Sequence, residues 1–503
     1  MSKKESHPRT AILNIVGLTP RHIGAHTPFI AGFSEREDNR LIHVTPAIPA
    51  VTSSMQATFL TGKLPGEHGI VANMWYDREF SEHRCWKQSN HLVKGRKLWE
   101  HLREEVSEKF TCAKVFWWNN MYSTADYQIT PRPIYCADGK KVFDIQTWPM
   151  NLRKKIKRKL GKFPFPAFWG PVAGIASSDW IAKSAKWFED KYSPDLNLVY
   201  LPHLDYNLQR IGPEDPAIKD DLRAIDEIVK NLVTHLEKRG VQVILLSEYG
   251  ITEVDRPIHL NRIFRKKGWL SWRNELKREM IDLGNCDAFA IPDHQVAHIY
   301  VKDEALLEPV REEILKQEGV THVYRKDELD EIGLANERSG DLVAVSDERS
   351  WFTYYYWEND RKAPDFARCV DIHRKPGYDP VELFVDPKIH FPKLKIAFKL
   401  LKKILGFRIL MDVIPLDASL VKGSHGAIPA SQEDHPVLIG AFPTTGDATG
   451  DTVEIKDVYD LLFKACAGKT PDAEEDKDKD KDKDKDKDKD KDKETDKETD
   501  QSL

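Results

Sequence analysis

The chain has 503 residues, of which 40% are hydrophobic and 10% aromatic, the composition of an ordinary globular protein. Its formal net charge of −5 arises at the C-terminal end, where the residues from Glu474 onward include 10 Lys and 15 Asp or Glu. The remainder therefore carries 66 basic and 66 acidic residues. This balance gives the body no net positive charge of the kind that marks a nucleic-acid-binding protein, and we expect no nucleic-acid partner.

The N-terminal region contains a short apolar stretch, residues 11–18, after the polar sequence MSKKESHPRT. The stretch is too short and too early for a signal peptide, and it predicts a strand. No segment reaches the roughly 18 apolar residues that span a bilayer. The six cysteines include no CxxC pair, which predicts reduced thiols. We therefore expect a cytoplasmic protein without a transmembrane span.

Four apolar runs rich in Val, Ile and Leu lack clean alternation, which is typical of strands buried on both faces of a parallel sheet. They are residues 11–18, 196–201, 241–246 and 436–442. Between the second and third runs, residues 219–239 place apolar side chains at helical spacing. This strand–helix–strand unit predicts an α/β fold with a mainly parallel sheet sandwiched by helices.

The regions between these runs are less regular. Residues 92–178 scatter Trp and Pro through basic stretches, and we expect them to cover one edge of the sheet. Residues 286–420 contain a predicted helix at 306–318 and many aromatics around 351–357, and we interpret them as an inserted cap region. The predicted domain spans residues 9–470, with its core in residues 9–90, 179–285 and 421–470.

Two segments have a biased composition. The Lys/Asp-rich tail, residues 474–503, cannot build a core and is predicted to be disordered. Residues 393–407 (KLKIAFKLLKKILGF) place apolar residues at helical spacing among lysines. The simpler interpretation is a cap helix with solvated lysines, and the alternative is peripheral contact with an acidic membrane surface.

The most informative segment is residues 49–77, PAVTSSMQATFLTGKLPGEHGIVANMWYD. A strand-to-helix turn here would present Thr52 just ahead of a helix over residues 53–60. The N-terminus of a helix has free amides and a positive dipole end, which suit a phosphate group. A threonine hydroxyl there is a nucleophile only if something such as a metal ion lowers its pKa. Otherwise Thr52 is a helix cap.

This segment resembles the nucleotide pyrophosphatase/phosphodiesterase branch of the alkaline phosphatase superfamily. Members of that branch show a proline, the nucleophilic threonine, a helix ending in TG, a second proline, HGI and an asparagine. The chain has these in the same order, at Pro49, Thr52, Thr61-Gly62, Pro65, His68-Gly69-Ile70 and Asn73. The resemblance implies an alkaline-phosphatase-like fold, Thr52 as the phosphoryl acceptor, and Asn73 as a ligand of the substrate phosphate.

Three later blocks follow the family's order. Residues 201–213 (LPHLDYNLQRIGP) resemble the segment with an aspartate and, four residues later, a histidine. Residues 245–254 (LLSEYGITEV) resemble the strand that ends in Asp-His-Gly-Met, and residues 423–436 (GSHGAIPASQEDHP) resemble the late Gly-Ser-His-Gly block. The matches extend from about residue 11 to residue 442, so the resemblance covers most of the chain.

The family holds two metal ions, commonly zinc, and its ligand positions carry over only in part. One site falls on Asp205, Gln209 and His425, and the other on Val16 and the pair Glu248-Tyr249. A glutamine amide is a weak substitute for imidazole, and valine cannot coordinate an ion. The resemblance therefore implies one or two divalent ions (Zn, Mg or Mn) at the remaining positions, Asp205, Gln209, Glu248 and His425. Oxygen ligands favour Mg²⁺ or Mn²⁺ over zinc.

Other polar residues are candidates for the same site. Asn14 and His203 each lie two residues from a ligand position, on what we expect to be the same strand face. In residues 368–383 (RCVDIHRKPGYDPVEL), Lys375 is a candidate clamp for the substrate phosphate and His373 a candidate general acid or ligand. The alternative for this cluster is a salt-bridged loop on the cap.

Two functions follow from these patterns. The first is a metal-dependent hydrolase of phosphoric esters or pyrophosphates, which would act on a small phosphorylated substrate through Thr52. The second is a pseudoenzyme that binds phosphorylated compounds or serves as a scaffold, and the joint occurrence of Val16, Gln209 and Tyr249 favours it. A third, a membrane-peripheral enzyme acting on phosphorylated lipid or polyprenyl compounds, rests on residues 393–407 alone. We take the hydrolase as the leading hypothesis.

Overall fold

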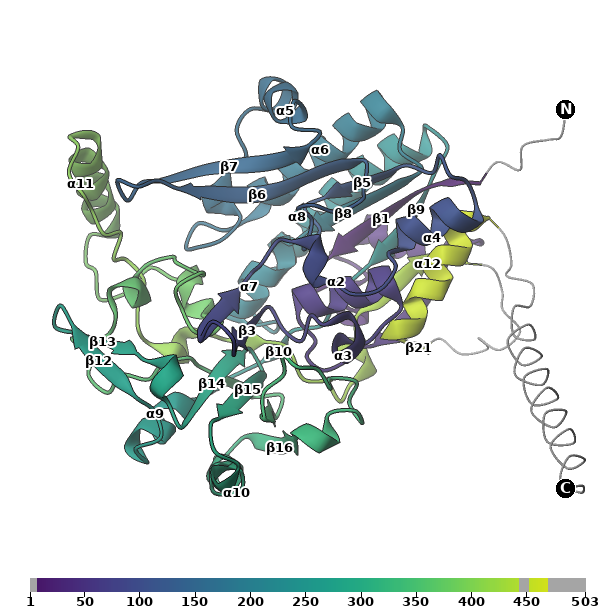
Figure 1. Ribbon diagram of the computed structural model, residues 1–503. Coiled ribbons are helices and arrows are strands. Elements are labelled where there is room, and N and C mark those ends of the chain that lie inside the picture. The colour runs from purple at the N-terminus through teal and green to yellow at the C-terminus, as the bar shows by residue number, and fades with distance from the viewer. Residues whose placement is uncertain (1–6, 443–451, 469–503) are drawn as a thin grey trace, which may run out of the picture.

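A nine-stranded sheet forms the centre of the protein, which is described here from a computed structural model covering residues 7–442 and 452–468 (Figure 1). The strand order is β21–β2–β20–β9–β1–β8–β5–β6–β7. The strands are β1 (Arg9–Ile15), β2 (Arg40–Thr45), β5 (Cys112–Val115), β6 (Tyr127–Tyr135), β7 (Lys141–Trp148), β8 (Leu196–Leu201), β9 (Val241–Leu246), β20 (Val437–Gly440) and β21 (Thr452–Glu454). The tail predicted for residues 474–503 lies outside the described residues.

Five neighbouring strands of the sheet, β9, β1, β8, β5 and β6, run parallel. The predicted mainly parallel α/β sheet is therefore confirmed, with three of the four predicted strands at its centre. The fourth, the run at 436–442, is a strand but not a parallel one, because β20 pairs antiparallel with both β9 and β2. An apolar run indicates burial and carries no information about strand direction, which depends on the path of the chain between strands.

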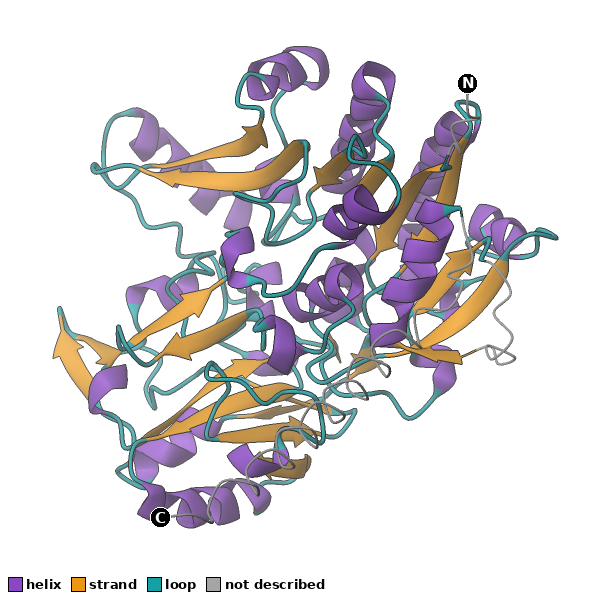
Figure 2. Cartoon of the chain, turned by 45° about the vertical axis from the view of Figure 1, so that its right-hand side comes forward, coloured by secondary structure: helices purple, strands orange, loops and turns teal. Residues whose placement is uncertain are grey.

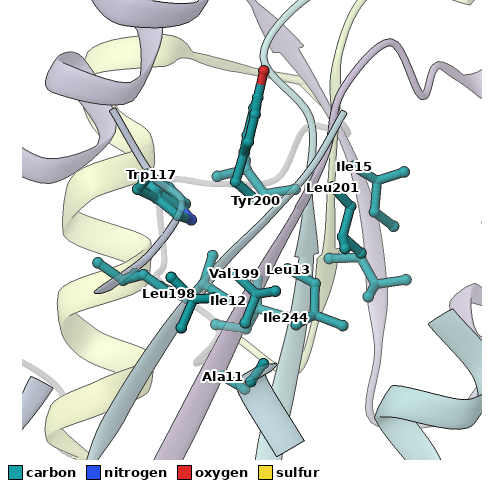
Figure 3. Close-up of a cluster of buried hydrophobic side chains, with 14 of the residues drawn as sticks. Ala11, Ile12, Leu13, Ile15, Trp117, Leu198, Val199, Tyr200, Leu201 and Ile244 are labelled. Atoms are coloured by element: carbon teal, nitrogen blue, oxygen red, sulfur yellow. The ribbon is translucent and has the colours of Figure 1, made fainter. Parts of the chain in front are cut away.

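The central strands are buried on both faces, as their continuous apolar sequences require. Figure 3 shows side chains of β1 and β8, among them Ile12, Leu13 and Val199, packed together with Ile244 of β9. Helices α2 (Thr52–Thr61), α4 (Leu98–Glu105) and α12 (Val458–Ala467) pack together against one face, and α1 (Pro28–Ser34), α6 (Ile175–Tyr192) and α8 (Ile218–Glu237) pack together on the other (Figure 1). The sheet is thus sandwiched by helices, as predicted.

The predicted helices are present. The patterns at 53–60 and 219–239 correspond to α2 and α8, and those at 306–318 and 393–407 correspond to α10 (Leu307–Leu315) and α11 (Pro392–Ile404). The remaining α-helices are α3 (Pro65–His68), α5 (Leu152–Leu160), α7 (His203–Ile211) and α9 (Leu260–Lys266). Among the described residues, no helix combines the length and the apolarity needed to cross a bilayer.

The region 92–178 extends the sheet instead of covering its edge. Its first strand, β5, pairs in parallel with β8 of the core, and the β6–β7 hairpin continues the sheet outward. The prediction of a covering insertion is therefore wrong for this segment. Its Trp and Pro residues obscured the short strand at 112–115, whose four residues are all buried.

Figure 2 shows a second group of strands beside the central sheet. A second hydrophobic core belongs to this part of the chain. It contains a four-stranded sheet in the order β14–β15–β17–β16 and the aromatic run Trp351–Trp357, whose side chains are buried. Most of it comes from the region predicted as a cap, and residues 254–283 also contribute. The strands are β14 (Ala288–Asp293), β15 (Val296–Val301), β16 (Val320–Arg325) and β17 (Leu342–Ser346), with small pairs β3 (Met74–Asp77) and β4 (Glu82–Cys85), β10 (Thr252–Glu253) and β19 (Gly423–Ser424), β11 (Arg256–Ile258) and β18 (Ser350–Phe352), and β12 (Trp272–Glu275) and β13 (Arg278–Ile281).

Candidate functional site

Thr52 is the first residue of α2, at the point where the loop after β2 enters the helix. The N-cap residue of the helix is Val51, so the alternative role of Thr52 as the helix cap does not apply. The Thr52 hydroxyl lies 3.0 Å from the hydroxyl of Tyr249. Thr52 is therefore placed as expected, at the positive end of a buried helix, but its partner is a phenol.

The Tyr249 side chain connects Thr52 to Asp205. Its hydroxyl donates to Asp205 Oδ1 at 3.2 Å and lies on its other side against Thr52. The ring stacks on the imidazole of His425, with centroids 3.6 Å apart and planes 5° from parallel. The resemblance placed Thr52, Asp205 and His425 around metal ions. In the structure the neutral phenol of Tyr249 contacts all three of them.

Asp205 and Gln209 lie one turn apart on α7, which begins directly after β8. The expectation that His203 and Asp205 share a strand face is therefore wrong, because the strand ends at Leu201 and both residues are helical. His203 Nε2 lies 3.0 Å from Asp221 and does not join the site. Burial raises the pKa of Asp205 to about 6, against the effect of its hydrogen bonds with Gln209 and Tyr249.

His425 is a neutral imidazole with a defined tautomer. Its Nδ1 lies 2.7 Å from the Ala50 carbonyl oxygen, which can only accept, so Nδ1 carries the hydrogen. Burial lowers the pKa of His425 to about 3. Nε2 therefore presents a lone pair, 3.9 Å from Asp205 Oδ1. His294 covers the imidazole as well, at a centroid distance of 3.7 Å.

Glu248 follows β9 and points into a set of amides. Its Oε1 accepts hydrogen bonds from Asn14 Nδ2 and Gln56 Nε2, each at 2.5 Å. Burial raises the pKa of Glu248 to about 8, so the carboxyl is mostly protonated at neutral pH. Asn14 donates its amide nitrogen to this carboxyl, and its Oδ1, the ligand atom that we had considered, is buried without a hydrogen-bond partner among the described residues.

These residues do not fit the two-ion metal site that the resemblance implied. Among the described residues, no group of three or more His, Cys, Asp or Glu side chains is arranged to hold a metal ion. Val16 is fully buried in the main hydrophobic core, and the Tyr249 ring covers one face of His425. The Gln209 amide oxygen accepts a hydrogen bond from Tyr378 at 3.3 Å. The expected ligands are close together, and Asp205 Oδ1, Gln209 Oε1 and Glu248 Oε1 accept hydrogen bonds from protein groups. Glu248 Oε2 is buried without a hydrogen-bond partner among the described residues.

Asn73 lies next to α2, as the resemblance implied, and its polar atoms are engaged within the protein. Its Oδ1 accepts from the Ser53 amide at 3.0 Å, in the first turn of α2. Its amide nitrogens donate to Asp293, the backbone N–H at 2.7 Å and Nδ2 at 3.2 Å. Asn73 thus fixes the N-terminus of α2 against the second core.

Among the described residues, the hydrogen bonds and ion pairs of Lys375 and His373 involve partners other than Thr52. The Lys375 ammonium contacts the carboxylates of Asp379 at 2.6 Å and Glu382 at 2.8 Å, and all three side chains are buried. His373 Nδ1 lies 3.3 Å from the Cys85 carbonyl oxygen. The structure thus favours the salt-bridged cap loop for this cluster and gives no direct support to the roles proposed for Lys375 and His373 in substrate binding.

Three further residues belong to the site and were not predicted from the sequence: Gln56, His294 and Tyr378. Gln56 lies one helical turn after Thr52 on α2, so its position could have been found from the helix period. His294 and Tyr378 reach the site from the second core, more than 100 residues away from His425 or Gln209, and no local pattern marks them.

The site is closed in this structure. None of Thr52, Asn73, Asp205, Gln209, Glu248, Tyr249 and His425 is more than 7% exposed. A phosphate group can therefore reach Thr52 only if covering side chains move.

Comparisons with known proteins agree with this architecture. Residues 10–379 match the family model described as type I phosphodiesterase/nucleotide pyrophosphatase. An uncharacterized pyrophosphatase/phosphodiesterase of Schizosaccharomyces pombe is 28% identical over 253 residues, which are 47% of this chain and 44% of that protein. The ectonucleotide pyrophosphatase/phosphodiesterase 2 of Saccharomyces cerevisiae is 23% identical over 49% of this chain and 48% of its own length. The chain thus spans less than half the length of either of these two relatives.

Two solved structures show the same fold. Murine ectonucleotide pyrophosphatase/phosphodiesterase 5 aligns with a TM-score of 0.56 at 17% identity, over 92% of this chain and 95% of that one. Phosphonoacetate hydrolase from Sinorhizobium meliloti, in complex with phosphonoformate, aligns with a TM-score of 0.57 at 14% identity, over 91% and 96%. At these identities the likeness concerns the fold, and it confirms the predicted alkaline-phosphatase-like architecture.

Proposed function

Because this chain belongs to the type I phosphodiesterase/nucleotide pyrophosphatase family, we propose that it hydrolyses phosphoric esters or pyrophosphates with Thr52 as the nucleophile. The observation that supports this role is the hydrogen-bonded series from Thr52 through the Tyr249 hydroxyl to Asp205. It connects an alcohol at a helix N-terminus to a carboxylate that can take its proton.

In the proposed reaction, Thr52 Oγ1 attacks the phosphorus atom in line with the leaving oxygen. The Thr52 proton passes to the Tyr249 oxygen as the Tyr249 proton passes to Asp205, so the phenol is neutral before and after the step. The bond from phosphorus to the leaving oxygen breaks, and Thr52 carries the phosphoryl group. Water then attacks the phosphorus, and the bond from phosphorus to Thr52 Oγ1 breaks. The proton on Asp205 returns through Tyr249 to Thr52 Oγ1, and the proton that water loses passes through the solvent to the leaving oxygen. The positive end of the α2 dipole faces the negative charge of the phosphoryl group.

No step of this proposal uses a metal ion, because the residues present do not fit the expected cage. A one-ion version, with an ion at Asp205, Gln209 and His425, would require the Tyr249 and Tyr378 hydroxyls to leave their present partners. Metal analysis and chelation separate the two versions. Without a resident ion, EDTA leaves turnover unchanged. One tightly bound divalent ion per chain, with EDTA-sensitive turnover, would establish the one-ion version.

A second function is favoured by the altered ligand positions. A pseudoenzyme that binds phosphorylated compounds would keep the fold and the α2 N-terminus without needing a reactive alcohol. The buried Tyr249 and the loss of the ligand at Val16 support this alternative. The inactive form of the murine structural relative was solved in complex with AMP, which makes AMP the first probe of binding.

The test is hydrolysis of bis-p-nitrophenyl phosphate, with mass spectrometry to detect phosphorylated Thr52. Thr52→Ala should lower turnover by about a thousandfold or more, as expected for loss of a nucleophile. Tyr249→Phe should lower it by about a hundredfold or more, as expected for loss of a proton-transfer group. Tyr355→Phe is the matched control, since its buried hydroxyl has no hydrogen-bond partner among the described residues.

Activity that survives Thr52→Ala would remove the nucleophile from the proposal. Binding of AMP without any turnover would favour the pseudoenzyme.

A further inference from the structure

Helix α11 turns its apolar side chains away from the protein. In the amphipathic helices of globular proteins, the apolar stripe faces the core. In α11 the side facing the protein includes Ile396 and two lysines, Lys395 and Lys399, which both form ion pairs with Asp412. No residue of α11 is buried. Figure 1 shows the helix standing at the edge of the molecule.

The outward side carries a continuous apolar stripe. Leu394, Phe398, Leu401 and Leu405 follow one another at helical spacing, and their exposed fractions are 68%, 56%, 52% and 65%. Phe391, Ile404 and Phe407 extend the stripe, and each is more than 60% exposed. Single exposed apolar residues are common on protein surfaces, but a contiguous set on one helix marks an interaction surface.

The charge around this stripe is entirely basic. Residues 387–411 contain six Lys and one Arg and no Asp or Glu. Among the described residues, Lys393, Lys402 and Lys403 make no ion pair, and Lys402 Nζ lies over the Phe398 ring at 4.7 Å. Long lysine side chains beside an apolar stripe can extend to a charged surface while the stripe enters an apolar phase.

A second basic helix provides an internal comparison. Helix α5 (LRKKIKRKL) is also rich in lysine and arginine, but it buries Leu152 and Ile156 against the protein and exposes only charges. Its arrangement is the ordinary one, and it has no unsatisfied apolar face. A comparison of the two helices therefore distinguishes the effect of positive charge alone from the effect of positive charge combined with an exposed apolar stripe.

We propose that α11 docks on a lipid bilayer that contains acidic phospholipids. The stripe from Leu394 to Leu405 enters the headgroup region, and Lys393, Lys402 and Lys403 contact lipid phosphates. Exposed apolar residues flanked only by positive charge match the two components of such a surface, the acyl chains and the anionic headgroups. The proposal is independent of the reaction at Thr52.

The test is sedimentation of the full chain with vesicles of phosphatidylcholine, with and without phosphatidylglycerol. The protein should sediment with the acidic vesicles, and high salt should weaken its binding. The triple variant Leu394→Ser, Phe398→Ser and Leu401→Ser should bind at least about tenfold more weakly, and Lys402→Glu with Lys403→Glu should also lose binding. Because no residue of α11 is buried, these variants should keep the unfolding midpoint of the wild type.

The matched control is Lys154→Glu with Lys155→Glu on α5, which changes the same number of charges on exposed residues. It should leave vesicle binding within about twofold of the wild type, since α5 has no exposed apolar stripe. Absence of sedimentation with acidic vesicles at low salt would overturn the proposal, as would wild-type binding by the triple serine variant. Equal losses of vesicle binding in the charge-reversal variants of α5 and α11 would show that net charge alone causes the binding. A wild type that forms dimers and does not bind vesicles, together with a triple serine variant that is monomeric, would show that the stripe binds a second copy of the chain.

Discussion

Lys375 is the residue whose substitution should affect stability most. Its ammonium lies between the carboxylates of Asp379 and Glu382 at 2.6 and 2.8 Å, and the three side chains are at most 2% exposed. Removing one partner of a buried ion pair leaves charge without compensation, which typically costs about 3–5 kcal/mol. We therefore expect Lys375→Met to lower the free energy of unfolding by that amount at neutral pH. Urea unfolding followed by tryptophan fluorescence measures the loss.

The pH dependence of this loss follows from the two carboxyls. Burial already raises the pKa of Asp379 and of Glu382, against the effect of the neighbouring ammonium. Without the ammonium both values rise further, so the folded variant binds protons that the unfolded chain releases. Its stability therefore increases relative to the wild type as the pH falls from about 7 to about 5.

An exposed pair with the same spacing serves as the control. Lys63 and Glu67 are also four residues apart and lie 3.0 Å from each other, but their side chains are 42% and 57% exposed. Lys63→Met should change stability by less than about 0.5 kcal/mol. Equal losses for the two lysine variants would refute the reasoning from burial. A Lys375→Met protein of normal stability that no longer binds AMP would restore Lys375 as a phosphate clamp.

Two further predictions concern other buried positions. Burial lowers the pKa of His68 to about 3, so the unfolded chain takes up a proton below about pH 6.5 that the folded chain does not. His68→Asn should remove up to about 1.4 kcal/mol of acid destabilisation for each pH unit below that value, and identical pH slopes in urea unfolding would contradict this. At Gly423, a Cβ atom would lie 2.0 Å from the Leu208 carbonyl oxygen, so Gly423→Ala should cost about 1–3 kcal/mol in the same assay. Gly32→Ala, in a helix with nothing within 4 Å, should be neutral or slightly stabilising, and equal effects at the two glycines would disprove the steric argument.

The elements predicted from the sequence were those with a strong local pattern. The run at 241–246 and the helix at 219–239 contain enough apolar residues at one period to identify their type. Strand β5 has only four residues, and Lys114 lies among them, so neither its existence nor its parallel pairing with β8 could be predicted from composition. The antiparallel direction of β20 depends on a long connection that no local pattern describes.

The site was predictable to the extent that its residues fall in contiguous motifs. The blocks containing Thr52, Asp205 and Glu248-Tyr249 identified side chains that the structure brings together. Their hydrogen-bond partners were not predictable, because Tyr378 and His294 belong to the second core. The role of Lys375 illustrates the same limit, since a lysine in a polar cluster gives no indication of whether its partners are substrate phosphates or buried carboxylates.

The position of β5 has a consequence for anyone who wishes to shorten this protein. Strand β5 lies between β8 and the β6–β7 hairpin, so residues 92–178 supply an interior strand of the sheet. Their deletion would leave the edge of β8 that faces β5 unpaired at residues 196–199, with fully buried side chains at a newly opened border. A truncated form made by excising that segment should aggregate, and a minimal version has to retain it.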